Sequence, residues 1–261
     1  MNSLYSQNSG VSLAKRAEGI MGQAFPAKDS ELPLKAVIFG AIGVIAETSD
    51  LQRQSFNLAF AEQGLDWSWD AETYRRLLKI NGGQARLRAY EAERPQPAPL
   101  SNAVIAKVHE RKTHHYAGLT QNGGLQPRKG VVELIDACRA AGVRVALCTS
   151  TSAENVDALR AALRDQLDFG NFASITTIDK ISAVKPAADA YLHCLAQLGL
   201  AADEVVAIED TPVCMASALA AGIAVVATPG AMTDDQDFTG AALKVVDLSA
   251  VSLAEIQAVL V

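Results

Sequence analysis

Short apolar runs of strand length constrain the fold of this chain more than any other feature. One run covers residues 35–39, and the others come in the second half, at 143–148, 204–208 and 223–227. Each run ends in polar residues or in Gly or Pro, and helical patterns separate the later runs. Apolar strands that alternate with helices are typical of a parallel sheet covered by helices on both faces. The sequence therefore predicts an α/β core built on these strands.

The stretch between the first two runs has a different character. Residues 50–120 show helical spacing of apolar residues, interrupted by a glycine pair and by prolines, and they carry no strand signal. We interpret this stretch as a helical cap inserted after the first strand, so that the core consists of residues 33–49 and 121–261. Residues 1–32 are rich in Ser, Asn and Gly without a long apolar run, and we predict an N-terminal extension there.

Composition narrows the class of protein. The chain has 261 residues, of which 49% are hydrophobic and 20% charged, and its net charge is −6. These values are typical of a globular protein, and the negative charge argues against a nucleic-acid partner. No apolar run reaches the roughly 18 residues of a membrane span, so we expect no membrane partner and a cytoplasmic location. The cysteines form no C-x-x-C pair, which argues against a zinc site or a disulfide framework. They are Cys138, Cys148, Cys194 and Cys214.

The ends of the predicted strands mark the expected ligand site. In open parallel sheets, ligands bind at the carboxyl ends of the strands. A cap inserted after the first strand would close over that same edge. We therefore expect Thr149, Lys185 and Asp210, which end or follow core strands, to gather around Gly40.

Several segments between residues 35 and 248 resemble the motifs of one enzyme superfamily. In chain order they are VIFGAIGVIAET (37–48), ALCTSTS (146–152), VKP (184–186) and AIEDTPVCMASALAAGI (207–223). They resemble the four motifs of the haloacid dehalogenase (HAD) superfamily of phosphohydrolases. A further segment, GLDWSWDAETYRRLLKINGG (64–83), resembles the cap of the CbbY-like and β-phosphoglucomutase-like subgroup. The resemblance implies a HAD-like Rossmannoid core with a parallel sheet and an inserted helical cap.

The first motif departs from this family at the residues that carry the chemistry. The family's first aspartate attacks phosphorus, and a second aspartate, two residues on, transfers protons. The resemblance places Gly40 at the nucleophile position and Ile42 at the acid/base position, and Val44 replaces the usual threonine. After the acid pair of the fourth motif, Val213 and Cys214 replace the family's Asn-Gly. The sequence thus offers no catalytic residue in the expected place.

The second and third motifs imply phosphate ligands. Thr149 and Ser150 offer hydroxyls and backbone amides ahead of a predicted helix, and Lys185 offers an ammonium group. Thr149 and Ser150 have a second interpretation, as N-caps of that helix. Because no first-motif aspartate competes, we expect Lys185 to pair with Asp210.

The resemblance also assigns a metal pair and two substrate contacts. Glu209 and Asp210 match the family's magnesium ligands, but without the first-motif aspartate they predict only weak Mg²⁺ binding. No other cofactor is predicted. Glu47, at the junction with the cap, and Arg86, within it, are the implied substrate ligands.

These observations predict a HAD-like hydrolase homologue, on a sugar-phosphate phosphatase scaffold, that has lost catalysis. Loss of one nucleophile from a covalent mechanism can cost on the order of 10⁶ in rate, so we expect a pseudophosphatase with background activity. Its ligand would be a sugar phosphate, inorganic phosphate or a protein partner. The alternative is an active sugar-(bis)phosphate phosphatase or phosphomutase with rearranged catalytic residues, for which Glu47 is the first candidate nucleophile.

Overall fold

The computed structural model of the protein describes residues 34–94, 99–122 and 124–260. These residues fall within one structural unit, Leu32–Val261. The extension predicted at residues 1–32 lies outside the described residues. None of the helices in the described ranges combines the length and the apolar character that a membrane crossing needs.

A parallel sheet of six strands, in the order β3-β2-β1-β4-β5-β6, forms the core. The strands are β1 (Ala36–Phe39), β2 (Arg144–Cys148), β3 (Ser174–Thr176), β4 (Val205–Glu209), β5 (Ala224–Ala227) and β6 (Leu243–Lys244). The predicted α/β class is confirmed, and the predicted runs correspond to β1, β2, β4 and β5. Strands β3 and β6 were not predicted from the sequence. These edge strands have 3 and 2 residues, too few to show a periodic pattern.

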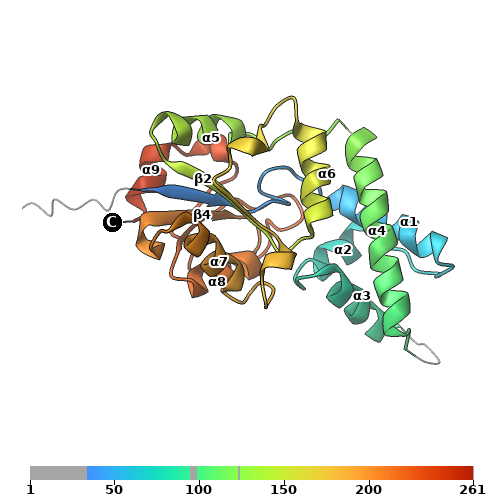
Figure 1. Ribbon diagram of the computed structural model, residues 1–261. Coiled ribbons are helices and arrows are strands. Elements are labelled where there is room, and N and C mark those ends of the chain that lie inside the picture. The colour runs from blue at the N-terminus through green and yellow to red at the C-terminus, as the bar shows by residue number, and fades with distance from the viewer. Residues whose placement is uncertain (1–33, 95–98, 123, 261) are drawn as a thin grey trace, which may run out of the picture. The chain divides into compact units, whose positions relative to one another are not determined.

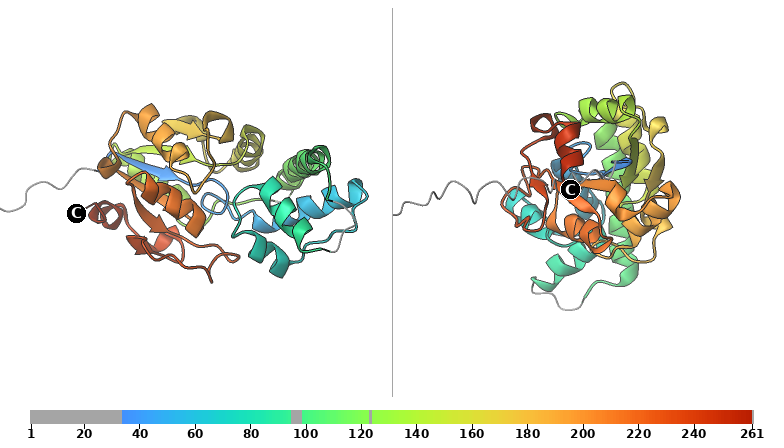
Figure 2. Two further views of the ribbon diagram at one scale, coloured as in Figure 1. Left: turned by 90° about the horizontal axis from the view of Figure 1, so that it is seen from below. Right: turned by 90° about the vertical axis from the view of Figure 1, so that its left-hand side faces the viewer.

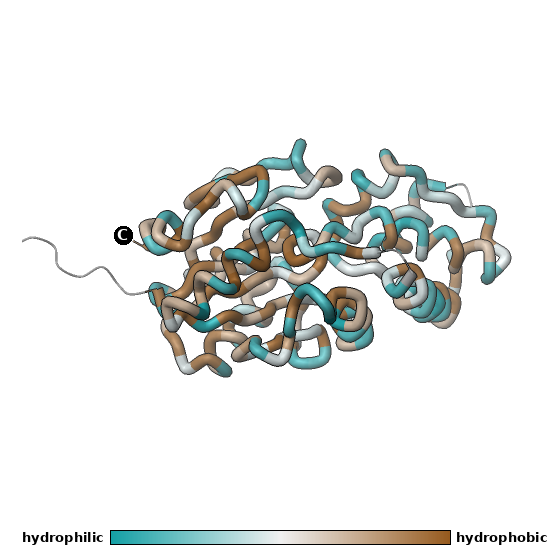
Figure 3. Tube along the Cα trace, turned by 90° about the horizontal axis from the view of Figure 1, so that it is seen from above, coloured by the Kyte–Doolittle hydropathy of each residue, from teal (hydrophilic) through white to brown (hydrophobic). Residues whose placement is uncertain are grey.

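Helices cover both faces of the sheet (Figure 1). One face carries α5 (Val131–Ala140), α6 (Ala153–Leu163) and α9 (Leu253–Ala258), and the other carries α7 (Asp189–Leu198) and α8 (Pro212–Ala220). Because side chains alternate along a strand, Phe39 of β1 joins the first of these cores and Ile38 joins the second. The central strands therefore contribute apolar side chains to both cores. Figure 3 colours hydrophobic residues brown, and brown segments run through the interior of the core. Short 3₁₀ helices lie at Phe169–Asn171, Ile178–Lys180, Ala202–Glu204 and Leu248–Ala250.

A group of four helices, which we call the helical block, follows β1. It consists of α1 (Ser49–Glu62), α2 (Ala71–Leu77), α3 (Gly83–Ala92) and α4 (Asn102–Asn122). The block has an apolar core of its own in which aromatic rings dominate. Trp69 is fully buried there, and its ring meets that of Phe60 edge to face with the centroids 5.0 Å apart. Figures 1 and 2 show the block beyond one end of the sheet, and no strand occurs in its described residues, 49–94 and 99–122.

Candidate functional site

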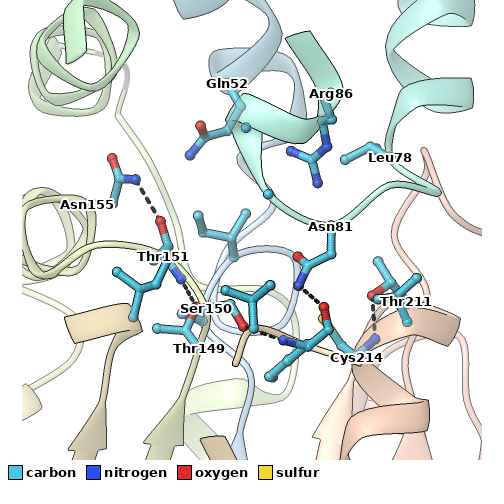
Figure 4. A pocket seen from close by; sticks show the side chains of 18 of the residues that line it. Gln52, Leu78, Asn81, Arg86, Thr149, Ser150, Thr151, Asn155, Thr211 and Cys214 are labelled. Carbon is cyan, nitrogen blue, oxygen red and sulfur yellow. Dashed lines mark hydrogen bonds between the residues drawn. The ribbon is translucent and has the colours of Figure 1, made fainter. Parts of the chain in front are cut away.

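A pocket of about 480 Å³ lies between the helical block and the carboxyl ends of the central strands. Its core side includes Gly40, Thr149, Lys185 and Asp210, the residues expected at this edge. Figure 4 views the pocket with the helical block above and the strand ends below. The side-chain amide of Asn81 donates a hydrogen bond of 2.5 Å to the carbonyl oxygen of Lys185 and so joins the two sides. The fold thus gathers distant motifs into one cavity.

Lys185 and Glu209 form a buried ion pair in the pocket. Their side chains are 2% and 1% exposed, respectively. Oε1 of Glu209 accepts hydrogen bonds from Lys185 Nζ and from the Tyr191 hydroxyl. Lys185 Nζ also donates to the carbonyl oxygen of Cys148 at 3.1 Å. Burial disfavours the charged ammonium and is the largest single effect, but the charge of Glu209, the hydrogen bond to it and contributions from Cys214 and Cys148 together raise the pKa of Lys185. Lys185 therefore stays charged.

The prediction that Lys185 pairs with Asp210 is wrong, and the geometry of β4 gives the reason. Side chains alternate between the two faces of a strand. Glu209 has the same parity as Ala207, which packs in the core beneath α7 and α8. Tyr191 of α7 lies on that face and shares Glu209 with the lysine. Asp210, one residue later, is directed elsewhere.

Two glycines of the first motif let both acids approach the loop after β1. A Cβ atom on Gly40 would lie 2.5 Å from Oε2 of Glu209, so this carboxylate occupies the space of the missing side chain. Gly43 has a φ of +83°, and a Cβ atom there would collide with the Asp210 carboxylate. Asp210 is 8% exposed, and its carboxylate has no hydrogen bond or ion pair with the residues that the structure describes. Burial, followed by the charges of Glu209 and Glu47, raises the pKa of Asp210 well above its usual value.

The loop between β2 and α6 carries the predicted phosphate ligands Thr149 and Ser150 (Figure 4). Thr149 Oγ1 accepts a hydrogen bond of 3.2 Å from the amide two residues on, and Ser150 Oγ accepts one of 3.2 Å from the Lys185 amide. Neither residue caps α6, because the N-cap is Ser152, whose side chain accepts from the amide of Asn155. Both hydroxyls act as acceptors in these bonds, so their protons can be donated to an anion.

Lys112 of α4 is a buried cation that was not predicted from the sequence. It is 4% exposed, lines the pocket, and has no hydrogen bond or ion pair within the described ranges. Its Nζ lies 5.3 and 5.2 Å from the ring centroids of Phe56 and Tyr116. Burial, followed by the charge of Arg86, lowers the pKa of Lys112 to about 7. The available signal was helical spacing, because Val108 and Tyr116, four residues to either side, are both buried.

Further polar groups of the helical block line the pocket together with this lysine. Arg86, a predicted substrate ligand, donates from Nε to two backbone carbonyl oxygens at 3.2 and 2.8 Å. Figure 4 shows its guanidinium directed into the pocket. The side-chain nitrogen of Gln52 is buried without a hydrogen-bond partner among the described residues. Burial, followed by the charge of Lys112, lowers the pKa of His109 to about 4, so this ring is neutral at pH 7. This side of the pocket therefore offers hydrogen-bond donors and positive charge.

Glu47, the other predicted substrate ligand, lies beside the pocket and is not among the residues that line it. Its Oε1 accepts a hydrogen bond of 2.9 Å from the amide of Ser49. Its Oε2 lies against Gly230, where a Cβ atom would collide with it. This position does not favour Glu47 as a nucleophile toward a ligand in the pocket.

Comparison with known proteins identifies the family. The model of the haloacid dehalogenase-like hydrolases matches residues 34–222, and the chain belongs to this family. Within it, the chain is similar to the CbbY proteins. It is 43% identical over 219 residues to protein CbbY of Rhodobacter capsulatus, across 84% of this chain and 96% of that protein. It is 36% identical over 209 residues to protein CbbY of Cereibacter sphaeroides, across 80% and 90% of the two chains.

Solved structures lead to the same group. CbbY from Rhodobacter sphaeroides in complex with phosphate matches with a TM-score of 0.79 and 34% identity, over 85% of this chain and 99% of that one. A mutant of the same protein in complex with xylulose-1,5-bisphosphate matches equally well, with a TM-score of 0.79. The predicted HAD-like and CbbY-like resemblance is confirmed.

This family usually uses Mg²⁺, but the donor atoms here fit that ion poorly. Glu209, Asp210 and Cys214 each present one ligand atom, and these atoms all lie within 4.8 Å of one another. Mg²⁺ demands near-octahedral coordination by oxygen atoms. Gly40 supplies no carboxylate, one oxygen of Glu209 is engaged by Lys185, and the third donor is sulfur. Only Asp210 has both carboxylate oxygens uncommitted within the described residues, and Glu209 offers a single oxygen, Oε2.

Proposed function

We propose that this protein binds a sugar phosphate without hydrolysing it, as a pseudophosphatase on the CbbY scaffold. The observation that carries the proposal is the first motif. Gly40 has no side chain to attack phosphorus, and Ile42 has no group that transfers a proton. The space beside Gly40 is occupied by the Glu209 carboxylate, which is held by Lys185. The family's covalent phosphoryl-enzyme step therefore has no side chain on which to occur.

Binding is supported by groups on opposite sides of the pocket. Thr149 and Lys185 lie on the core side, and Arg86 and Lys112 on the helical side. The acids that line the pocket in the described part of the chain belong to the core side. A buried ammonium without a counter-charge is costly, and a phosphate group of the ligand would supply that charge. We extend to this protein the ligand class of the CbbY relative, whose xylulose-1,5-bisphosphate carries two phosphate groups.

The proposal also assigns roles to the larger parts of the molecule. We assign the cap to residues 50–120, which form most of the helical block and cover the ligand, and the core that holds one phosphate to residues 33–49 and 121–261. Mg²⁺ is not required for binding, because Lys185 and the hydroxyls after β2 supply positive charge and donors. We place the protein in the cytoplasm.

Calorimetric titration with xylulose-1,5-bisphosphate and with inorganic phosphate, beside an assay of phosphate release, tests the proposal. We expect both ligands to bind, the bisphosphate more tightly, with no release of phosphate above background. Lys112→Met should weaken bisphosphate binding by about 10- to 100-fold, the value of a charge-assisted hydrogen bond, and should change inorganic phosphate binding little. Lys107→Met, at an exposed lysine of the same helix, is the matched control and should change neither.

Two results would overturn the proposal. Phosphate release at about 1 s⁻¹ or faster would establish the alternative of a rearranged phosphatase or phosphomutase. Loss of that activity in Glu209→Gln or in Glu47→Gln would then identify the replacement nucleophile. Failure of both ligands to bind would eliminate the ligand class and favour a protein partner.

A further inference from the structure

Three potential metal ligands converge at the end of β4. The strand ends at Glu209, Asp210 follows it, and Thr211 caps α8 by accepting a hydrogen bond of 3.2 Å from the Cys214 amide (Figure 4). This cap places Cys214 in the first turn of α8, where it lines the pocket together with both acids. One ligand atom from each of the three residues lies within 4.8 Å of the others.

Asp210 gives an independent indication that a cation binds here. It is 8% exposed, so more than nine tenths of it is buried, and its carboxylate has no hydrogen bond or ion pair with any residue that the structure describes. Buried carboxylates without a partner are rare, because desolvation of the charge is left uncompensated. The glycine at Gly43 leaves room for this carboxylate in the pocket. A bound cation would compensate the charge.

The donor set discriminates between cations. Oε1 of Glu209 is bonded to Lys185 and Tyr191, but Oε2 lies free beside Gly40. Burial, followed by the charge of Glu209, raises the pKa of the Cys214 thiol to about 12, so this thiol is protonated until a metal displaces its proton. With Glu209 balanced by Lys185, the ionised Asp210 and Cys214 of the metal-bound site carry two negative charges, which a divalent cation neutralises. Thiolate sulfur selects zinc-like cations, whereas Mg²⁺ prefers oxygen.

We propose that Glu209, Asp210 and Cys214 form a binding site for a thiophilic divalent cation of the zinc class. As the metal–sulfur bond forms, the S–H bond breaks and the proton passes to solvent. Three protein ligands leave a tetrahedral ion one further position for an oxygen of water or of a pocket ligand. Cysteine spacing predicted no zinc site, because it reveals only sites built from cysteine pairs. The partners of Cys214 are instead two carboxylates, which the fold places beside it. The inference is independent of the proposed function, since metal binding is tested without a sugar phosphate.

Cobalt titration of the full chain, freed of metal by a chelator and kept reduced, tests this site. A thiolate–cobalt bond produces a charge-transfer band in the near ultraviolet, which we expect in the wild type. Zn²⁺ should abolish the band by displacing cobalt, and excess Mg²⁺ should not. Cys214→Ala should lose the band and bind Zn²⁺ about 10-fold or more weakly, since even outer-shell residues contribute that much to metal affinity. Cys138→Ala, at a buried thiol of α5 in the core on the opposite face of the sheet, is the matched control and should keep the band.

Asp210→Asn provides a second variant if Cys214→Ala fails to fold. It keeps the thiol and should also weaken Zn²⁺ binding. The proposal is refuted if cobalt binds without a charge-transfer band, if the band persists in Cys214→Ala, if Mg²⁺ displaces cobalt as readily as Zn²⁺ does, or if Asp210→Asn leaves the zinc affinity unchanged.

Discussion

Replacement of the buried lysine of α4, Lys112→Met, should stabilise the ligand-free protein while it weakens bisphosphate binding. The lysine is 4% exposed and has no acid beside it in the described residues. In the folded protein its pKa falls from 10.5 to about 7, because burial and then the charge of Arg86 disfavour the ammonium. Methionine has a similar length and can pack against the rings of Phe56 and Tyr116 without a charge.

The magnitude follows from the linkage between protonation and folding. Since each pKa unit is worth 1.36 kcal/mol, the lowering of this pKa corresponds to about 4 kcal/mol of lost unfolding free energy at pH 7. The rings of Phe56 and Tyr116 stabilise the charged form and so offset part of this loss. We therefore expect Lys112→Met to raise the free energy of unfolding by about 2–4 kcal/mol. The unfolded chain holds more protons than the folded one between the two pKa values. The unfolding free energy of the wild type should therefore rise with pH from about 7 to about 10.

Urea unfolding in phosphate-free buffer, at several pH values across this window, measures both effects. Lys112→Met should be more stable than the wild type at pH 7 and should lack part of the rise with pH. Lys107→Met removes an exposed lysine from the same helix and should retain the wild-type slope. A Lys112→Met protein that is less stable than the wild type at pH 7, or that keeps the full slope, would refute the reasoning.

Two further substitutions test the base of the pocket, each by urea unfolding. Lys185→Met leaves the Glu209 carboxylate buried without its cation and should lower the free energy of unfolding by about 3–5 kcal/mol. Lys180→Met, at an exposed lysine, is the control and should lower it little. Equal losses in the two variants would contradict the buried ion pair. Gly43→Ala imposes an unfavourable φ of +83° and drives a Cβ atom into Asp210, so it should cost about 1–3 kcal/mol. Gly64 has a φ of +67° with open space around it, so Gly64→Ala should lower the free energy of unfolding by less. A larger loss in Gly64→Ala than in Gly43→Ala would contradict the close approach of Asp210 to Gly43.

The sequence by itself determined the sheet and the place of the site. The runs 36–39 and 205–208 are apolar throughout, and a strand buried on both faces explains such runs at strand length between helices. The ends of these strands then located Gly40 and Thr149 at one edge. The edge strands β3 and β6 were not predicted, because strands of 3 and 2 residues are too short to show a periodic pattern. The resemblance of residues 37–48 to the family's first motif also predicted that Gly40 and Ile42 stand in place of its catalytic aspartates.

Tertiary structure decided which charged groups meet. Lys185 pairs with Glu209 instead of Asp210 because β4 presents Glu209 to the face where Tyr191 lies. Helical spacing places Lys112 on the buried face of α4, but its burial beside aromatic rings depends on the packing of α4 against α1, a segment distant in the sequence. Cys214 likewise becomes a potential ligand only because the cap of α8 sets its first turn beside the strand end. Electrostatic partners depend on three-dimensional distance and on exclusion of water, whereas strand and helix patterns depend on neighbours along the chain.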